Sequence, residues 1–499
     1  MRVAVSTLCP ARWKEREDAR RQRLFAPERT TCPRMAAYLR YTVSGGAPRH
    51  DDTVSFWGDS MRASFIHTAD NHLGYEQYGL RERFDDFAKA FLDVVDDAIA
   101  RQVDFFAIAG DLFNKRAIDA QTLMQASYAL QRLKDAGIPT VGIEGNHDRS
   151  YYRDGTSWLQ FLCWQGLITL LNPTVSDGGP DITPFDTRTR RGAYADFKSG
   201  ALRVYGLPWY GVSTARVIES FSARLAAQRE QEEREGVRYR VLLMHTGIDG
   251  IVPMMHGLPS YEQFQPLRGL VDYVGLGHVH KQYERDNWLF NPGSTETWGA
   301  EESLWDRGYY RVTVDTDVPE GEPRHVAELV INRRRPFFRF TFRVDGLPAP
   351  AQLYDRFERE CRQWYAENEA ERDASSLEPV VDVAMQGVLG FDADAIERTR
   401  LEDMVRELFH PLTVRIHDNT RSAEYDAFGD DSAEGLDRST WHELEMHIFE
   451  ELIGRDARYL PEAANWANVL SQMKQMALTG EAPAEIARVL RDARARLVR

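Results

Sequence analysis

The sequence predicts an α/β protein in which a large layered domain is followed by a small α+β unit and a helical C-terminal segment. Short apolar runs alternate with amphipathic stretches from residue 61 to about residue 332. A shorter β-α-β-α-β pattern then runs to about residue 420, and residues 439–499 contain only helical patterns. Alternating strands and helices are typical of layered α/β domains.

The first domain is predicted to span residues 61–332. Helices are expected at Phe84–Ala100 and Ala120–Ala136, where apolar residues recur at helical spacing. The run Arg224–Glu235 is highly charged, so we interpret it as a solvated helix or a lid-like insertion. The clearest strands are the apolar runs Arg62–His67, Phe105–Ala109, Thr140–Ile143, Val204–Leu207, Val241–Met244 and Tyr273–Gly275.

A compact second domain is predicted for residues 333–420. Helices are expected at Ala351–Ala370 and Ala393–Phe409. They alternate with the predicted strands Phe337–Val344, Val380–Met385 and Leu412–His417. Residues 421–438 are acidic and contain Gly and Ser, which indicates a linker between this domain and the C-terminal segment.

Residues 439–499 are expected to form helices with apolar stripes. The first stripe consists of Trp441, Leu444, Ile448 and Leu452. The second consists of Trp466, Val469, Leu470, Met473 and Met476. Two short helices cannot bury both stripes against each other alone, so we expect a third element or another protein to cover them.

Residues 1–60 differ in character from the rest of the chain. They are rich in Arg, show little hydrophobic periodicity and carry no secretory signal pattern. We expect folded structure to begin near Met61. Residues 1–60 would then be a disordered extension or the product of an upstream start-site artefact.

The composition argues against several classes of protein. Lys and Arg number 62 against 77 Asp and Glu, a net charge of −15, so DNA binding would need a local basic surface, metal ions or a partner. The four cysteines form no CxxC pair, which argues against a zinc ribbon or disulfide scaffold and fits a reducing cytoplasm. No run approaches the roughly 20 apolar residues of a membrane-spanning helix, so no membrane association is expected.

Polar side chains follow five predicted strands of the first domain. Because the carboxyl ends of strands in α/β sheets meet at one edge, we expect these clusters to assemble into a single site. The clusters are Asp70-Asn71-His72, Gly110-Asp111, Gly145-Asn146-His147-Asp148, His245 and Gly277-His278-Val279-His280.

These residue types suit divalent metal ions. In D-x-H and H-x-H the two polar side chains lie on one face of an extended segment. A mixed set of about seven oxygen and nitrogen ligands suits two ions of the Mn, Fe or Zn kind better than one tetrahedral zinc. Two ions about 3.5–4 Å apart can activate a water and bind a phosphoryl group. Each motif alone is more often structural, so the prediction depends on their combination and order.

The order D-x-H, GD, GNHD, H and GHVH resembles that of the calcineurin-like metallophosphoesterase superfamily. Within it, the chain resembles the SbcD-type nuclease subunit of the double-strand-break repair complex. The resemblance rests on the segments HTADNHLG (67–74), AGDLF (109–113), GNHD (145–148), MHTG (244–247), GLGHVH (275–280) and NPGSTE (291–296). The resemblance implies a four-layer metallophosphoesterase β-sandwich flanked by helices for residues 61–332, a capping domain for 333–420 and an ATPase-binding helical segment for 439–499.

The resemblance also implies the roles of individual residues. One metal ion, expected to be Mn²⁺, would be held by Asp70, His72, Asp111 and His280. A second would be held by Asp111, Asn146, His245 and His278, with Asp111 bridging the two ions. His147 would stabilise charge in the transition state or protonate the leaving 3′ oxygen, and Asp148 would orient the His147 imidazole.

One position departs from the archaeal and eukaryotic pattern GDLFH. Its final histidine is replaced here by Asn114. Metal binding and hydrolysis should survive, but the replacement leaves open how closely DNA ends are positioned as in the archaeal relatives. Nearby side chains could contact DNA, although ordinary surface charge and packing explain them equally well: Lys115, Arg116, Arg149, Lys281, Tyr75, Tyr78 and Tyr151.

The resemblance implies a Mn²⁺-dependent DNA exonuclease and endonuclease that acts on DNA ends and hairpins in the cytoplasm, at the nucleoid. An SMC-like ABC-type ATPase (SbcC-like) would bind residues 439–499. Two alternatives remain open: a small-molecule phosphodiesterase, and a DNA-end-binding scaffold with weak nuclease activity. A homodimer through Phe84–Ala100 or Ala120–Ala136 also remains open, because burial within one chain explains both helices equally well.

Overall fold

The computed structural model describes most of the chain from Met61 onward. The described residues are 61–150, 155–176, 178–253, 255–319, 321–422, 446, 449–450, 453, 459–478 and 483–497. The predicted extension at residues 1–60, the predicted linker beyond Ser422, Tyr151 and the stripe Trp441, Leu444, Ile448 and Leu452 lie outside the described residues.

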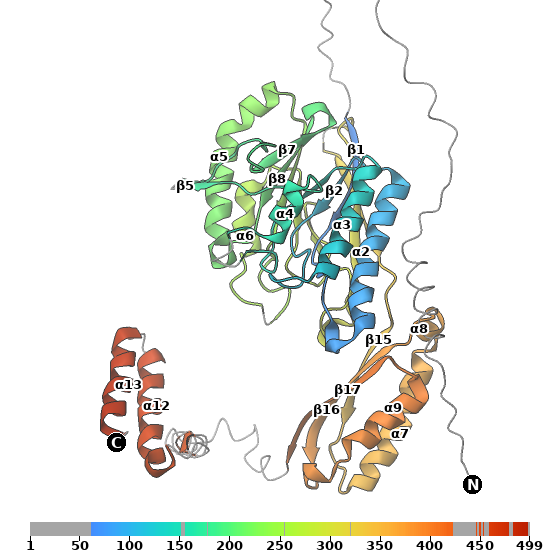
Figure 1. Cartoon of the computed structure of the whole chain (residues 1–499), viewed down its shortest axis with the longest axis vertical. Helices are drawn as coiled ribbons and strands as arrows, with labels where there is room; N and C mark the ends of the chain where they lie inside the picture. The colour runs from blue at the N-terminus through green and yellow to red at the C-terminus, as the bar shows by residue number, and fades with distance from the viewer. Residues whose placement is uncertain are drawn as a thin grey trace, which may run out of the picture. The chain divides into compact units, whose positions relative to one another are not determined.

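Residues 61–332 contain two six-stranded mixed sheets (Figure 1). The first sheet has the order β14 (His325–Ile331), β13 (Gly308–Asp315), β1 (Arg62–Thr68), β2 (Phe105–Ile108), β3 (Thr140–Gly142) and β4 (Thr169–Leu170). The second sheet has the order β11 (Tyr283–Arg285), β12 (Leu289–Asn291), β10 (Tyr273–Leu276), β9 (Tyr239–Met244), β8 (Leu202–Leu207) and β7 (Tyr194–Phe197). The central strands of each sheet are parallel, so their carboxyl ends lie at one edge.

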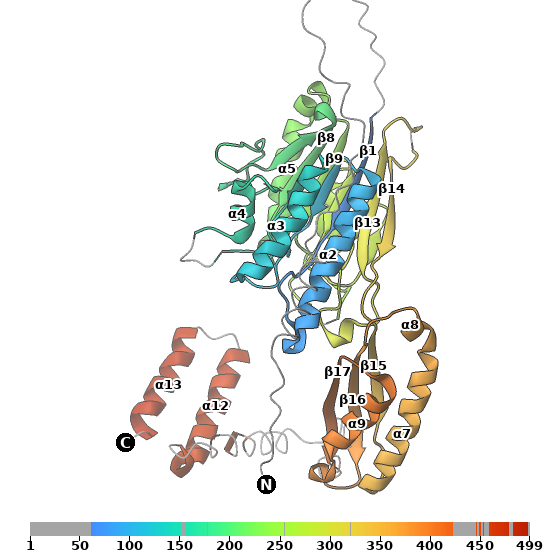
Figure 2. The ribbon, with the colours of Figure 1, turned by 45° about the vertical axis from the view of Figure 1, so that its right-hand side comes forward.

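Helices cover the outer face of each sheet. The helices α2 (Arg81–Arg101), α3 (Ala120–Asp135) and α4 (Trp158–Trp164) pack on the first sheet. The helices α5 (Thr214–Arg234) and α6 (Tyr261–Phe264) pack on the second. Figures 1 and 2 show α2 and α3 running side by side. A core of side chains from both sheets fills the space between them, so the layers are helix, sheet, sheet and helix, which confirms the predicted four-layer sandwich.

The strand β1 illustrates why these segments form buried strands. Phe65 points into the core between the sheets, whereas Ile66 points toward α2 and α3. Both faces of β1 are therefore apolar, as expected for a central strand with parallel neighbours and cover on both sides. The same division recurs on β2, where Phe105 faces the second sheet and Phe106 faces the helices.

Short elements complete the first domain. A two-stranded hairpin joins β5 (Val175–Ser176) and β6 (Gly179–Pro180). The 3₁₀ turns are η1 (Gln77–Gly79), η2 (Lys198–Gly200), η3 (Gly211–Ser213), η4 (Gln265–Leu267) and η5 (Ala300–Glu302).

The charged run Arg224–Glu235 belongs mainly to α5 and is not a lid. Val217, Phe221 and Leu225 of α5 pack on the second sheet. Near the end of α5, the Glu232 side chain is 2% exposed and its carboxylate lies 2.7 Å from Arg240 Nε. Tyr205 donates a hydrogen bond to the same carboxylate. The run is thus a helix, but the expected solvation fails at Glu232, because Arg203 of β8 and Arg240 of β9 pair with its buried carboxylate.

Residues 337–422 form a three-stranded parallel sheet with helices on one face. The strands are β15 (Phe337–Arg343), β16 (Val380–Leu389) and β17 (Thr413–Ser422), with β16 in the centre. The connections contain α7 (Pro350–Glu367), α8 (Glu369–Asp373), η6 (Ala393–Ala395) and α9 (Arg398–Phe409). Leu353 and Phe357 of α7 and Leu401 of α9 pack on the sheet. The predicted β-α-β-α-β order is therefore present.

The C-terminal helices α12 (Ala463–Leu478) and α13 (Pro483–Leu497) follow the 3₁₀ turn η8 (Leu460–Glu462) and pack on each other. Trp466 and Val469 of α12 and Ala493 of α13 form their buried centre. Leu470 and Leu490 remain 36% and 41% exposed. Among the described residues, no helix combines the length and apolar composition needed to cross a lipid bilayer.

The buried charge at Glu232 generates a stability prediction. Glu232→Ala should lower the free energy of unfolding by about 3–5 kcal/mol, because Arg240 would keep its charge in the interior without its partner. Chemical denaturation followed by circular dichroism measures the change. The matched control is Glu233→Ala, which removes an exposed carboxylate one residue away and should leave the denaturation midpoint nearly unchanged. Equal midpoints for Glu232→Ala and the wild type would contradict the prediction.

Candidate metal centre

The polar clusters predicted from the sequence meet where the carboxyl ends of the parallel strands of both sheets converge. The loops after β1 and β2 are joined by backbone hydrogen bonds from Asp70 N to Gly110 O (3.1 Å) and from Asn71 N to Asp111 O (2.9 Å). The loops after β9 and β10 are connected through Gly277 N, which donates to Met244 O (3.1 Å). Residues from both sheets therefore face one common site.

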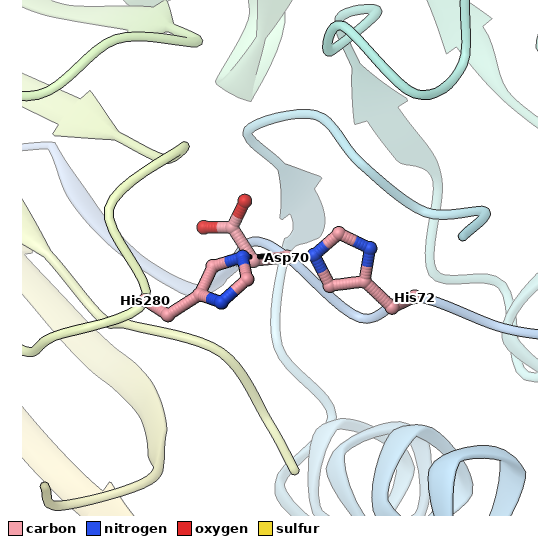
Figure 3. A group of neighbouring side chains, drawn as sticks. All are labelled: Asp70, His72 and His280. Atoms are coloured by element: carbon pink, nitrogen blue, oxygen red, sulfur yellow. Dashed lines mark hydrogen bonds between the residues drawn. The ribbon is translucent and has the colours of Figure 1, made fainter. Parts of the chain in front are cut away.

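Asp70, His72 and His280 form the first group of donors in this site. Their candidate ligand atoms all lie within 4.8 Å of one another. His72 Nε2 and His280 Nε2 are 3.0 Å apart. Figure 3 shows that the three side chains point toward one another, although His280 comes from a segment distant in sequence.

Asp111, His245 and His278 form a second group within the same 4.8 Å limit. Asp111 Oδ2 lies 3.3 Å from His245 Nε2. Asn146 Oδ1 lies 3.2 Å from the same nitrogen, so Asn146 joins this group. A third group consists of His72, Asp111 and His147. Asp111 thus lies between the first and second groups, where a bridging carboxylate would be required.

Several donors sit on backbone that L-residues rarely adopt. Asp70, His72, Asp111 and His278 have φ values of 50°, 48°, 50° and 78°. Such left-handed residues cost about 1–3 kcal/mol each and cluster at functional sites. Gly110, at φ 90°, has a further constraint, because a Cβ there would lie 2.3 Å from His245 Nδ1. The site is therefore held by the surrounding fold and not by local preference.

Burial and mutual charge shift the pKa values of these donors strongly. Burial raises the pKa of Asp70 to about 6. Burial also acts to raise the pKa of Asp111, but the nearby His245 outweighs it and the net pKa lies below its ordinary value. For His245, burial acts to lower the pKa and the Asp111 carboxylate raises it to a net value of about 9. Asp111 and His245 thus stabilise each other's charged forms, and a metal ion bound at His245 Nε2 would replace the proton there.

Two of the histidines are oriented by partners behind them. His245 Nδ1 donates to the carbonyl of Ala109 at 2.7 Å, which leaves Nε2 facing Asp111. His280 Nδ1 lies 2.8 Å from Glu302 Oε1, and Glu302 Oε2 is in turn 3.0 Å from Arg307. A ligand histidine that binds a carbonyl or carboxylate through its second nitrogen is the usual arrangement at protein metal sites.

The donor set fits a pair of divalent ions. It combines carboxylate and amide oxygens with imidazole nitrogens, as Mn, Fe and Zn ions accept. Two further observations support the fit. His72 Nδ1 is buried and has no hydrogen-bond partner among the described residues. His72 Nε2 and His280 Nε2 also approach each other to 3.0 Å beside the Asp70 carboxylate, so three potential ligand atoms converge. One ion would be held by the group around Asp70 and the other by the group around His245.

The structure corrects the expected role of Asp148. Its carboxylate accepts hydrogen bonds from the backbone amides of Leu112, Phe113 and Gly145, at 3.0–3.3 Å. The imidazole of His147 instead donates through Nδ1 to the carbonyl oxygen of Asn114, at 2.5 Å. Asp148 therefore joins the loops after β2 and β3, and the backbone of Asn114 orients His147. The GNHD spacing could not reveal this, because the partner comes from another loop.

The flanking basic residues differ in their surroundings. Arg116 is partly buried and donates to the carbonyl of Asn146 at 3.4 Å, so it supports the ligand loop. Arg149 is exposed, and its guanidinium lies 5.5 Å from the Trp209 ring centroid. Lys115 is exposed and Lys281 partly buried.

Sequence reasoning missed Glu302 and Trp298. Glu302 reaches His280 from the short turn η5 and lies eleven residues after Asn291, the end of β12, so it does not directly follow a strand as the predicted clusters do. The ring centroid of Trp298 lies 5.6 Å from that of His280 and 6.1 Å from that of His72. The only signal for Trp298 was its position two residues after the segment NPGSTE.

Comparison with known proteins agrees with this geometry. Residues 63–282 match the family model described as calcineurin-like phosphoesterase. The DNA double-strand break repair protein Mre11 of Methanosarcina mazei is 29% identical over 292 residues, 57% of this chain and 40% of that protein. The protein of the same name from Archaeoglobus fulgidus is 43% identical over 246 residues, 48% of this chain and 51% of that protein. The alignments thus span about half or less of these relatives.

Among solved structures, the calcineurin-like phosphoesterase YfkN from Bacillus subtilis is similar at 12% sequence identity and a TM-score of 0.37, covering 61% of this chain and 98% of that one. The sequence comparisons carry the assignment. Residues 63–282 form a calcineurin-like phosphoesterase domain, and the chain is a homologue of the Mre11 DNA double-strand break repair proteins.

Proposed function

We propose that this protein is a DNA phosphodiesterase that processes DNA ends in double-strand break repair. The observation that carries the proposal is the convergence of seven donor side chains from five loops, with Asp111 shared between two groups. The seven are Asp70, His72, Asp111, Asn146, His245, His278 and His280. The similar proteins from Methanosarcina mazei and Archaeoglobus fulgidus are named for DNA double-strand break repair.

Two divalent ions, which we propose to be Mn²⁺, would supply an activated water and neutralise charge on the phosphodiester. The chain's own contribution is to fix the donors and a proton-transfer group beside them. His147 Nδ1 donates to the Asn114 carbonyl, which leaves Nε2 free. In the imidazolium form, Nε2 carries the second ring proton and would pass it to the leaving 3′ oxygen, which returns the imidazole to its neutral form. The amide of His147 donates to Asp111 Oδ1 at 2.8 Å, which fixes His147 beside the shared carboxylate.

A basic sheet face favours a polymer substrate over a small phosphodiester. Phe338, Phe342 and Ile416 point toward α7 and α9, so the alternating residues of β15 and β17 point away from those helices. Those alternating residues include the exposed arginines Arg339, Arg343, Arg415 and Arg421. On a chain of net charge −15, such a local basic surface is what DNA phosphates would require.

We also propose that residues 439–499 bind an SMC-like ABC-type ATPase and that the protein acts in the cytoplasm at the nucleoid. The support for an ATPase site is the incomplete burial of α12 and α13, on which Leu470 and Leu490 stay partly exposed. Apolar residues at helical spacing are a common docking surface for a partner helix.

The first prediction concerns the substrate. The full chain with Mn²⁺ should degrade linear double-stranded DNA, and a chelator should abolish this activity. Arg343→Ala combined with Arg421→Ala should weaken DNA turnover while hydrolysis of bis(p-nitrophenyl) phosphate stays unchanged, because the small diester does not need the basic face. Gel assays and absorbance measure the two activities. Hydrolysis of the small diester alone would favour a small-molecule phosphodiesterase, and DNA binding without cleavage would favour a scaffold.

The second prediction concerns His147. His147→Ala should lower kcat by about 10²–10⁴-fold, because a positioned proton donor typically contributes that much. Bound Mn²⁺, measured by elemental analysis, should be retained by this variant and lost from His245→Ala. The control is the exposed His256→Ala, which should behave as the wild type. Full activity in His147→Ala would remove its assigned role.

The third prediction concerns the partner. Deleting residues 439–499 should abolish capture of the SMC-like ATPase of the same organism, because the apolar helices would be missing. Mn²⁺-dependent hydrolysis of the small diester should persist, because all the proposed donors lie before residue 281. Co-purification and a diester assay measure the two properties. Continued capture of the ATPase by the shortened chain would contradict the docking assignment.

A further inference from the structure

Asn114 occupies the position at which the chain departs from the GDLFH pattern, and both its side chain and its backbone are engaged at the metal centre. The indole nitrogen of Trp298 donates a hydrogen bond to Asn114 Oδ1, at 2.9 Å. An indole N–H can only donate, so the amide of Asn114 must present its oxygen. The backbone amide of Asn114 donates to Leu73 O at 3.0 Å, which fixes the loop after β2 to the loop after β1.

Trp298 is enclosed on several sides. Its ring stacks on Tyr75, with centroids 5.4 Å apart and planes 26° apart. It also lies against the rings of His72 and His280, at 6.1 Å and 5.6 Å. Its carbonyl oxygen accepts a hydrogen bond from Gln77 at 2.8 Å. The indole therefore packs against His72 and His280, two proposed ligands of one metal ion.

The same residue also positions the proton-transfer group. The carbonyl oxygen of Asn114 accepts the hydrogen bond of His147 Nδ1. The ring of His72 neighbours both partners of Asn114, since its centroid is 5.1 Å from that of His147 and 6.1 Å from that of Trp298. Asn114 thus positions the Trp298 indole through its side chain and the His147 imidazole through its backbone carbonyl.

We propose that Asn114 is a positioning residue whose side chain, through Trp298, fixes the orientation of His72 and His280 as metal ligands. This inference rests on the proposed function, because it assigns a task within the proposed metal site. Loss of the amide oxygen would leave the Trp298 N–H without its partner and let the indole move. The two imidazoles that it contacts would then lose their support, while the backbone contact to His147 would persist.

The experiment measures Mn²⁺ binding to the full chain by calorimetry, together with kcat and KM on bis(p-nitrophenyl) phosphate. Asn114→Leu has nearly the same shape but no acceptor oxygen, whereas Asn114→Asp keeps one. Outer partners of metal ligands typically contribute about 10–100-fold in metal affinity. We expect about tenfold weaker Mn²⁺ binding at one of two sites in Asn114→Leu, and recovery of most of the affinity in Asn114→Asp.

Trp298→Phe provides the matched control, because it removes the indole N–H and keeps an aromatic ring. If the hydrogen bond carries the effect, Asn114→Leu should weaken Mn²⁺ binding further by less than twofold in the Trp298→Phe background. Thermal unfolding of each variant without metal verifies that it is folded. A variant that fails to fold is replaced by Asn114→Ser, which retains a shorter acceptor and should show an intermediate loss of affinity.

The outcomes separate this inference from the proposed function. Wild-type Mn²⁺ affinity in a folded Asn114→Leu would overturn the positioning role and leave the proposed function intact. Equal losses in Asn114→Leu and Asn114→Asp would also overturn it, because the acceptor oxygen would then not matter. Failure of the wild type to bind Mn²⁺ and to hydrolyse phosphodiesters would overturn both.

Discussion

The contact between Asp111 and His245 is the one on which the candidate metal centre depends. Asp111 follows β2 in the first sheet and His245 follows β9 in the second, and their side chains lie 3.3 Å apart. The hydrogen bond from His245 Nδ1 to the carbonyl of Ala109 turns Nε2 toward Asp111, so both donors face the position that a metal ion would occupy. Because the contact joins the two sheets, the sandwich must pack correctly before the donor set can exist.

Residues that are not proposed ligands hold the metal centre in place through hydrogen bonds. Ala109 and Glu302 fix the second nitrogens of His245 and His280, and the backbone of Asn114 fixes His147. Asp148 binds three backbone amides and so closes the loops after β2 and β3. These contacts offset part of the cost of the left-handed backbone at the ligand positions and orient the imidazoles of His245, His280 and His147.

A buried arginine connects this support to the start of the three-stranded sheet. Arg83 donates to Gln77, which donates to the carbonyl of Trp298 at the metal site. Arg83 also pairs with Asp86, and Asp86 pairs with Arg335, which donates to the carbonyl of Glu378 just before β16. Trp298 at the metal site and the start of β16 are therefore joined by one network of hydrogen bonds and ion pairs. Asp86 is central to it, because its carboxylate pairs with two buried arginines, Arg83 and Arg335.

The sequence by itself determined the two helices packed side by side, the central strands and the five polar clusters, because apolar periodicity and polar residues at strand ends are local signals. The choice of seven ligands within those clusters came from the family resemblance. The strands β13 and β14 escaped it. β13 pairs with β1, which lies about 250 positions earlier in the chain, and β14 is attached to the sheet only through β13. Only the tertiary structure decided the partners: it moved Asp148 from the His147 imidazole to backbone amides, buried Glu232 within a charged helix, and brought Glu302 and Trp298 to the ligands. Such contacts depend on how loops from two sheets pack together, and no spacing within one segment records that.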